Sequence, residues 1–465
     1  MTYVFYDTET TGTETAFDQI LQFAAIKTDD DFNELDSFNI RCRIHPYAVP
    51  SPGALFVTNV TPAMLVDQSY PSHYEAIRKI RAKLMSWSPA VFVGYNSIDF
   101  DEDLLRQALF QTLHSAYLTN TNGNARGDVM RFANAVASYY PDAIAVPEDE
   151  KGRKTFKLER LAPANGFQHD NAHEAMSDVR ATIFMARLLR ERAPDVWDAM
   201  SRATRKADAV DMLYAAPILS ITERMFGRTY SWLATACGTN PNNSGQVAIF
   251  DLAYNPDEYI GLSADELIDV LNAKTKVIRT VRANAQPIVM PANRAPDIAK
   301  ALAVPKEERE RRAALVADNA VFQARVAEAL SRRHEDKEPP AHIEQRIYDG
   351  FPSDADNILM EKFHGTPWAD RHDFCGKFKD ERVSEFSRRV IYCERPETLP
   401  KNDKKRLKEW ALSRVTTTND VPWMTAPKAL AQLEEVSETA NEEGAKRITE
   451  IKAYIDGLVE RIEKY

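Results

Sequence analysis

Four short strand-like segments in the first hundred residues restrict the fold of this chain more than any other feature. Three are largely apolar runs, at residues 3–6, 20–26 and 90–95, and in the fourth, at residues 38–44, apolar and polar residues alternate as in a half-buried strand. Turn residues or segments with helical spacing separate them. Three strands come first, and mixed helices and a fourth strand follow. This order predicts an α/β domain with a mixed sheet that ends near residue 195.

The pattern changes after that point. Short strand-like pieces separated by Asn, Pro and Gly turns predict a small β-rich domain; they are Tyr230–Thr235, Gln246–Leu252, Thr275–Val281 and Pro287–Met290. A charged helical stretch follows, and the chain beyond about residue 345 is predicted to be all helical. Apolar residues near the C-terminus recur in steps of three and four over barely two heptads, which favours packing in a bundle over a dimeric coiled coil. We therefore divide the chain into residues 1–195, 196–345 and 346–465.

Length and composition exclude several classes of protein. A chain of 465 residues is too long for one ordinary domain. No apolar stretch is long enough to cross a bilayer, the N-terminus does not resemble a signal peptide, and the four cysteines form no C-x-x-C pair. We therefore expect a cytoplasmic monomer without a zinc site or disulfide framework. The net charge of −10 argues against a protein that coats nucleic acid, although basic residues cluster locally at 151–160 and 401–408.

Asp7 and Glu9 form the first candidate site. They lie two residues apart on the first predicted strand, so their side chains point to the same face, roughly 6.6 Å apart along the chain. Two such carboxylates repel each other unless protons or cations intervene, and Mg²⁺ prefers oxygen ligands of this kind. The alternative is that this D-x-E merely begins a solvated turn.

Two later segments carry similar residues. After the fourth predicted strand, Asp99, Asp101 and Asp103 lie at the start of a helix, where they could bind a metal or simply cap the helix. Further on, His173 and Asp178 open a long helix, and a histidine there can accept a proton from water. The alternative is a loop histidine and a surface acid. The three segments together, in this order, are much more specific than any one alone.

The first of these segments resembles a known family. Residues 5–12, Phe-Tyr-Asp-Thr-Glu-Thr-Thr-Gly, are similar to the first motif of the DEDD exonucleases of the ribonuclease-H-like fold, and the spacing from His173 to Asp178 resembles the subclass with a catalytic histidine. Residues 154–161, 164–166, 171–178, 52–54 and 348–356 are similar to bacterial exonuclease I. One departure is Thr11, where that family is expected to have an aromatic residue.

The resemblance implies a fold and a set of site residues. It implies an exonuclease domain, a Src-homology-3-like β-domain with a helical extension and a C-terminal helical domain, in the order of our three segments. It also implies two Mg²⁺ ions, replaceable by Mn²⁺: one held by Asp7, Glu9 and Asp178, the other by Asp7 and Asp101, with His173 as the general base. Substrate contacts are expected at Thr10, Asn96, Arg106, Arg131 and Lys157.

The implied activity is removal of 5′-mononucleotides from the 3′ end of single-stranded DNA, in DNA repair and recombination. A single-stranded DNA-binding protein is the implied partner. Two alternatives stay open: an RNA-trimming or proofreading exonuclease of the same superfamily, and a non-catalytic nucleic-acid-binding scaffold. Because every candidate catalytic group precedes residue 179, we expect residues 1–195 alone to fold and to cleave weakly.

Overall fold

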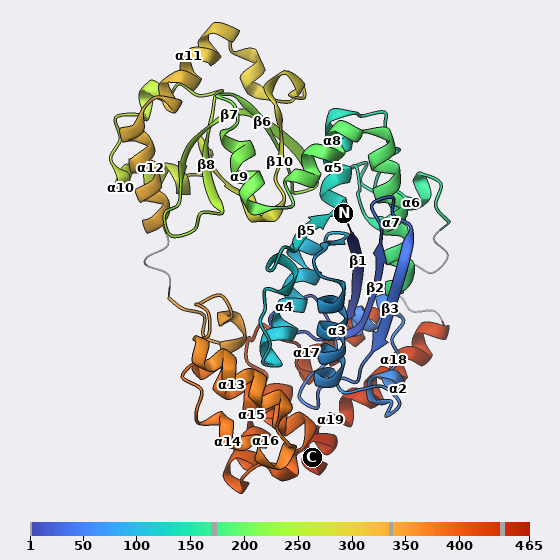
Figure 1. Cartoon of the computed structure of the whole chain (residues 1–465). Coiled ribbons are helices and arrows are strands. Elements are labelled where there is room, and N and C mark those ends of the chain that lie inside the picture. The colour runs from blue at the N-terminus through green and yellow to red at the C-terminus, as the bar shows by residue number, and fades with distance from the viewer. Residues whose placement is uncertain (1, 169–173, 334–337, 438–441) are drawn as a thin grey trace.

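A five-stranded mixed sheet forms the centre of the first third of the molecule (Figure 1). The computed structural model describes residues 2–168, 174–333, 338–437 and 442–465. The strand order is β3-β2-β1-β4-β5, in which β1 is antiparallel to β2 and parallel to β4. The strands are β1 Tyr3–Thr10, β2 Ile20–Thr28, β3 Glu34–Arg41, β4 Val91–Gly94 and β5 Ala125–Asp128. The predicted mixed sheet is confirmed, but β5 was missed, because its Ala-Arg-Gly-Asp sequence is buried without being apolar.

Helices cover both faces of this sheet because its central strand is apolar on both. Phe5 faces a core formed with α5, α7 and α8, whereas Val4 and Tyr6 face a core formed with α3 and α4. Trp197 of α8 is buried in the first of these cores, which therefore extends beyond residue 195. The helices of this region are α1 Pro52–Thr58, α2 Pro62–Val66, α3 His73–Trp87, α4 Asp101–Gln111, α5 Val129–Tyr139, α6 Leu158–Ala164, α7 Ala175–Arg192, α8 Pro194–Arg202 and α9 Lys206–Tyr214.

The second region is built on a five-stranded antiparallel sheet with the order β10-β6-β7-β8-β9. Its strands are β6 Leu219–Met225, β7 Arg228–Thr239, β8 Gln246–Asp251, β9 Ile278–Arg282 and β10 Ile288–Pro291, and β6 is the strand that the sequence did not reveal. The helices α10 Ala264–Asn272, α11 Lys306–Ala317 and α12 Ala320–Arg332 share a core with this sheet. The β-rich unit followed by charged helices agrees with the prediction.

The C-terminal third is helical, as predicted, and it shares a core with the first third. Leu55, Tyr74 and Phe110 of the first region belong to one buried cluster with Phe386 and Ile451 of the last. Figure 1 shows these C-terminal helices lying against α2, α3 and α4. Their bounds are α13 Asp354–Gly365, α14 His372–Cys375, α15 Glu381–Glu394, α16 Lys401–Thr416, α17 Ala426–Ser437, α18 Glu442–Asp456 and α19 Leu458–Lys464.

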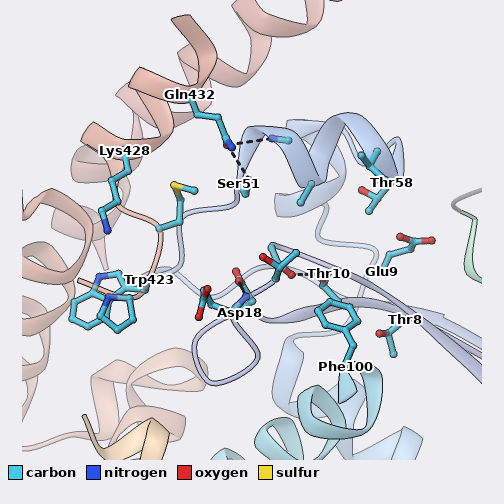
Figure 2. Close-up of a pocket in the computed structure, with 18 residues that line it drawn as sticks. Thr8, Glu9, Thr10, Asp18, Ser51, Thr58, Phe100, Trp423, Lys428 and Gln432 are labelled. Atoms are coloured by element: carbon cyan, nitrogen blue, oxygen red, sulfur yellow. Dashed lines mark hydrogen bonds between the residues drawn. The ribbon is translucent and has the colours of Figure 1, made fainter. Parts of the chain in front are cut away.

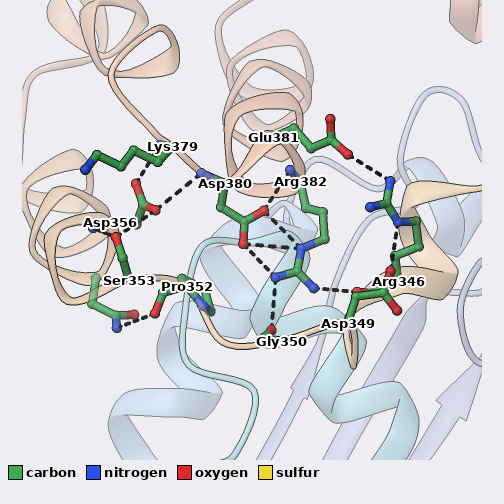
Figure 3. Close-up of polar contacts among 11 residues, drawn as sticks. Arg346, Asp349, Gly350, Pro352, Ser353, Asp356, Lys379, Asp380, Glu381 and Arg382 are labelled. Carbon is green, nitrogen blue, oxygen red and sulfur yellow. Dashed lines mark hydrogen bonds and ion pairs between the residues drawn. The ribbon is translucent and has the colours of Figure 1, made fainter. Parts of the chain in front are cut away.

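A polar network fixes the segment that enters the helical region (Figure 3). The Arg382 guanidinium, at the start of α15, donates to the Asp380 carboxylate at 2.6 Å and to the Gly350 carbonyl at 3.0 Å. Asp356 accepts the backbone N–H of Lys379 at 2.9 Å. These bonds attach residues 348–356, which are similar to bacterial exonuclease I, to the start of α15. The segment therefore anchors the connection between the second and third regions.

Within the four described ranges, no helix is both long enough and apolar enough to cross a bilayer.

Candidate active site

Three carboxylates from two elements converge at one end of the central strand. Asp7 and Glu9 extend from the same face of β1, as their spacing predicted, and Asp178 lies in the first turn of α7, which packs against β1. One carboxylate oxygen from each residue lies within 4.8 Å of the other two. Glu9 is buried, and Asp7 and Asp178 are half-buried. Such a cluster can bind a cation from three directions.

Asp101 approaches the same cluster from the opposite helix layer. It is the first residue of α4 and only 4% exposed, and the Thr8 hydroxyl donates to its carboxylate at 2.5 Å. Its charge, after burial, is the largest cause that raises the pKa of Asp7. The charges of Asp101 and Asp7 therefore oppose each other, so the two carboxylates compete for protons.

The other two acids at the start of α4 face elsewhere. Asp99 accepts hydrogen bonds from Arg131 at 2.5 Å and from Arg282 at 3.0 Å. Asp103 accepts the Tyr348 hydroxyl at 2.7 Å. Of the three acids, Asp101 is the one whose charge raises the pKa of Asp7, whereas the other two are engaged with basic or tyrosine side chains.

The electrostatics of the cluster favour bound cations. Burial, followed by the charges of Asp178 and Asp101, raises the pKa of Glu9 from 4.5 to about 9. Burial and the neighbouring carboxylates raise the pKa of Asp7 well above its ordinary value, and burial raises that of Asp101 to about 7. Among the described residues the buried Glu9 Oε1 has no hydrogen-bond partner. An all-carboxylate donor set with an unsatisfied buried oxygen fits a divalent metal ion.

Glu174 is a nearby acid that the sequence did not single out. It caps the start of α7 by accepting the Ser177 N–H at 3.1 Å, and it also accepts the Gln22 side-chain amide at 2.8 Å. Its charge contributes to the raised pKa values of Asp7 and Glu9. Glu174 thereby positions the first turn of α7 beside β1. The predicted general base, His173, lies outside the described residues.

The predicted substrate-contact residues lie in different parts of the structure. Asn96 and Arg131 line a pocket of about 400 Å³ between the first and second regions. Three further arginines that the sequence gave no reason to group line the same pocket, which we call the arginine pocket: Arg224, Arg279 and Arg282. The Arg279 guanidinium carbon lies 3.8 Å from the Trp232 ring centroid. Arg224 lies on β6 and the other two arginines lie on β9, so the three form no local sequence pattern, which explains why they were missed.

Arg106 and Lys157 are not among the residues that line this pocket. The Arg106 side chain is 9% exposed, and its Nε donates to Glu102 at 2.9 Å. This burial runs against the phosphate contact expected of Arg106, because its charge is already neutralised inside the fold. The Lys157 side chain is 74% exposed at the start of α6, and its Nζ lies 3.5 Å from Glu159.

A second pocket begins at Glu9, one of the clustered carboxylates, and has a volume of about 630 Å³ (Figure 2). Thr10, another predicted contact, lines it beside Glu9, and its hydroxyl donates to the Gly12 carbonyl at 2.7 Å. The opposite wall comes from the C-terminal helical region, with Trp423, Lys428 and Gln432. We call this space the Glu9 pocket.

Comparisons with known proteins agree with this arrangement. A family model described as Exonuclease matches residues 4–185, and one described as Exonuclease I C-terminal domain matches residues 341–458. The exonuclease I structure from Methylocaldum szegediense has a TM-score of 0.85 and 25% identity, and covers 98% of this chain and 99% of that chain. Escherichia coli exonuclease I in complex with a dA16 oligonucleotide has a TM-score of 0.82 and 24% identity, with 98% and 100% covered.

Curated relatives match over most of their length. Exodeoxyribonuclease I of Haemophilus influenzae is 27% identical over 402 residues, which are 83% of this chain and 84% of that protein. Exodeoxyribonuclease I of Escherichia coli (strain K12) is 30% identical over 378 residues, which are 77% of this chain and 78% of that protein. The family models match the first and third regions, the relatives match most of the chain, and the carboxylate cluster is in place. The chain therefore belongs to the exodeoxyribonuclease I family of nucleases.

Proposed function

We propose that this chain removes 5′-mononucleotides from the 3′ end of single-stranded DNA in DNA repair and recombination, as a cytoplasmic monomer. The observation that carries the proposal is the convergence of Asp7, Glu9 and Asp178, with Asp101 adjoining them. This cluster lies in an exonuclease domain, and its charges suit the divalent ions that such domains use.

Each acidic residue has a distinct proposed task. Asp7, Glu9 and Asp178 would hold one Mg²⁺ ion, and Asp7 with Asp101 the other; Mn²⁺ is expected to substitute. Ions held by these residues would supply positive charge to the attacking and the leaving oxygen of a phosphodiester. His173 would accept the proton of the attacking water, and the 3′ oxygen of the penultimate nucleotide would leave. Thr8 would keep Asp101 oriented through its hydrogen bond.

Two observations support a single-stranded DNA substrate. Solved structures of E. coli exonuclease I contain dA16 and dT13 oligonucleotides. In this chain, the arginine pocket offers four guanidinium groups between the first and second regions, and that of Arg279 lies over the ring of the buried Trp232. Basic grooves with aromatic surfaces are typical of proteins that hold single strands. Arg131 and Asn96 would contact the strand there, and Thr10 would contact its end in the Glu9 pocket.

A partner is proposed on similar grounds. One solved exonuclease I structure is described as a complex of SSB and exonuclease I with an inhibitor. We infer that a single-stranded DNA-binding protein docks on this chain through an acidic segment, since basic surfaces suit acidic peptides. Co-elution of the chain with such a protein at low salt, and loss of that co-elution when the acidic segment is removed, would test this.

The decisive experiment is a time course on three 5′-labelled substrates: single-stranded DNA, blunt duplex DNA and RNA. We expect Mg²⁺-dependent, stepwise shortening of the single-stranded DNA, release of 5′-mononucleotides and little action on the duplex. Asp178→Ala serves as the inactive control. Faster shortening of RNA would favour the RNA-trimming alternative, and the absence of turnover with any metal would favour the scaffold alternative.

A further inference from the structure

The C-terminal helical region supplies one wall of the Glu9 pocket, more than 400 positions along the chain from Glu9 itself. In Figure 2 the labelled residues Trp423, Lys428 and Gln432 lie across the pocket from Thr8 and Glu9. A volume of about 630 Å³ falls within the roughly 300–1,000 Å³ of small-molecule sites. The pocket can therefore accommodate a group of nucleotide size directly beside the carboxylates.

This wall is held against the first region by specific bonds. The Gln432 side-chain oxygen accepts the Ser51 hydroxyl at 3.0 Å and the Gly53 N–H at 3.3 Å. The Ser51 N–H in turn donates to the Thr11 carbonyl at 2.7 Å, just beyond the end of β1. A continuous series of hydrogen bonds thus connects α17 to the strand that carries Asp7 and Glu9.

Trp423 itself is fixed in position but not enclosed. Its indole N–H donates to the Arg414 carbonyl at 2.9 Å, and the Arg414 guanidinium carbon lies 4.6 Å from its ring centroid. The Phe17 ring centroid lies 5.4 Å away. The indole is only half-buried and lines the pocket. A ring locked by its neighbours and still accessible is a suitable surface for another flat group, because little entropy is lost on contact.

The chemistry of the pocket distinguishes a base from a phosphate. Next to Trp423 the wall contains the apolar Pro422 and Met424, and the ammonium of Lys428 in the same wall already donates to the Val421 carbonyl. The loop opposite contributes the carboxylates Glu14 and Asp18. Acidic groups repel a phosphate, whereas aromatic and apolar surfaces bind the faces of nucleobases. A phosphodiester would be placed at Glu9, where the proposed metal ions would offset the carboxylate charges, and the nucleoside beyond it would extend toward the indole.

We propose that Trp423 is a specificity-determining residue: the base of the 3′-terminal nucleotide rests against its ring, so the C-terminal helical region participates in recognising the strand end. The proposal depends on the proposed function, because it assumes a 3′ end positioned at the carboxylates. It assigns to the third region a direct contact with the nucleotide that is removed.

The test compares two single-stranded oligonucleotides that differ only at the 3′ terminus, which carries either a thymine or an abasic tetrahydrofuran residue. For the whole chain, we expect removal of the thymine nucleotide to be faster by about tenfold, the scale of one base–aromatic contact. Trp423→Ala should reduce this ratio toward one, and Trp423→Phe should restore most of it. Trp410→Ala is the matched control: it removes another aromatic neighbour of Arg414 that does not line the pocket, and should keep the wild-type ratio.

A wild-type ratio in a folded Trp423→Ala variant would overturn the proposal. If that variant does not fold, photo-crosslinking of the unmodified protein decides the question, with 5-iodouracil at the terminal or at an internal position and a chelator present. Crosslinking of the terminal base to the peptide that contains Trp423 supports the contact, and crosslinking only elsewhere refutes it. Failure of the proposed function is distinguishable, because neither oligonucleotide would then be shortened by any variant.

Discussion

The Thr8 hydroxyl donates a hydrogen bond of 2.5 Å to the Asp101 carboxylate, and this bond connects the central strand to the first turn of α4. Both residues are buried. The bond favours the charged form of Asp101 and opposes the burial that raises its pKa to about 7. Thr8, which lies between the two clustered carboxylates of β1, thus lowers the pKa of a third carboxylate.

Replacing Thr8 with Val tests this control. The methyl group keeps the shape but removes the donor, so the pKa of Asp101 rises further and its charged form appears only at higher pH. The acid limb of the pH profile of kcat/KM should move upward by about one pH unit, since a hydrogen bond to a charged group contributes about 1.5–3 kcal/mol. Thr28→Val, whose hydroxyl donates to the Asp29 carbonyl, is the control and should leave the limb in place.

Asp7→Ala and Asp178→Ala should each reduce cleavage to background while the fold is retained. Each removes a proposed metal ligand, and each also removes a like charge from a crowded cluster. Cleavage of a labelled oligonucleotide and the thermal midpoint in chelator would be measured together. Near wild-type turnover in either variant would show that the site has been placed incorrectly.

The same cluster makes stability depend on pH when metal is withheld. The folded-state pKa of Glu9 is raised from 4.5 to about 9, so between these values the folded chain binds more protons than the unfolded chain. Stability in chelator should therefore fall as the pH rises through this window, and Mg²⁺ at pH 8 should restore it by at least about 2 °C in Tm. Glu9→Gln should flatten this dependence; an equal slope in the variant and the wild type would contradict the assignment.

His173→Ala should lower the turnover rate by about 10²–10⁴, the usual effect of losing a general base. Binding of Mn²⁺, measured by calorimetry, should remain close to that of the wild type. If the variant instead failed to bind metal, His173 would be a ligand and not a base.

The affinity for single-stranded DNA should depend on salt concentration because particular lysine and arginine side chains contact phosphates. Lys157→Ala and Arg279→Ala are each expected to reduce the slope of log K against log salt by about 0.7, one phosphate's contribution on a single strand. Arg131→Ala should reduce it less, because Asp99 already neutralises much of its charge. Arg311→Ala, whose guanidinium pairs with Glu308 and Asp257 away from the arginine pocket, should leave the slope unchanged. Slopes that stay unchanged in the first three variants would reject this binding surface.

Much of the first region could be predicted because the sequence patterns that specify it lie within short segments. Buried strands such as residues 20–26 have apolar runs, and the D-x-E spacing of Asp7 and Glu9 requires the two side chains to share a face of β1. β5 was not predicted as a strand because it is buried by the neighbouring layers and its own residues are not apolar. The roles of Trp423 and Arg279 were not predicted for a related reason. A single aromatic or basic residue acquires its surroundings only when distant segments pack together.

The expectation that residues 1–195 suffice for a folded, weakly active fragment is revised by the shared core. Leu55, Tyr74 and Phe110 pack against C-terminal helices, so a fragment without those helices would expose a large apolar surface.

The core between Leu55 and Ile451 also has a consequence for how the protein is made. At about 5–20 residues per second, a ribosome needs roughly 20–80 s to synthesise the segment between them. During that interval the N-terminal part of the nascent chain has no partner for its apolar face, and the wall opposite Glu9 does not yet exist. The core therefore closes only after the C-terminal helices are translated, and until then its apolar face is exposed to aggregation.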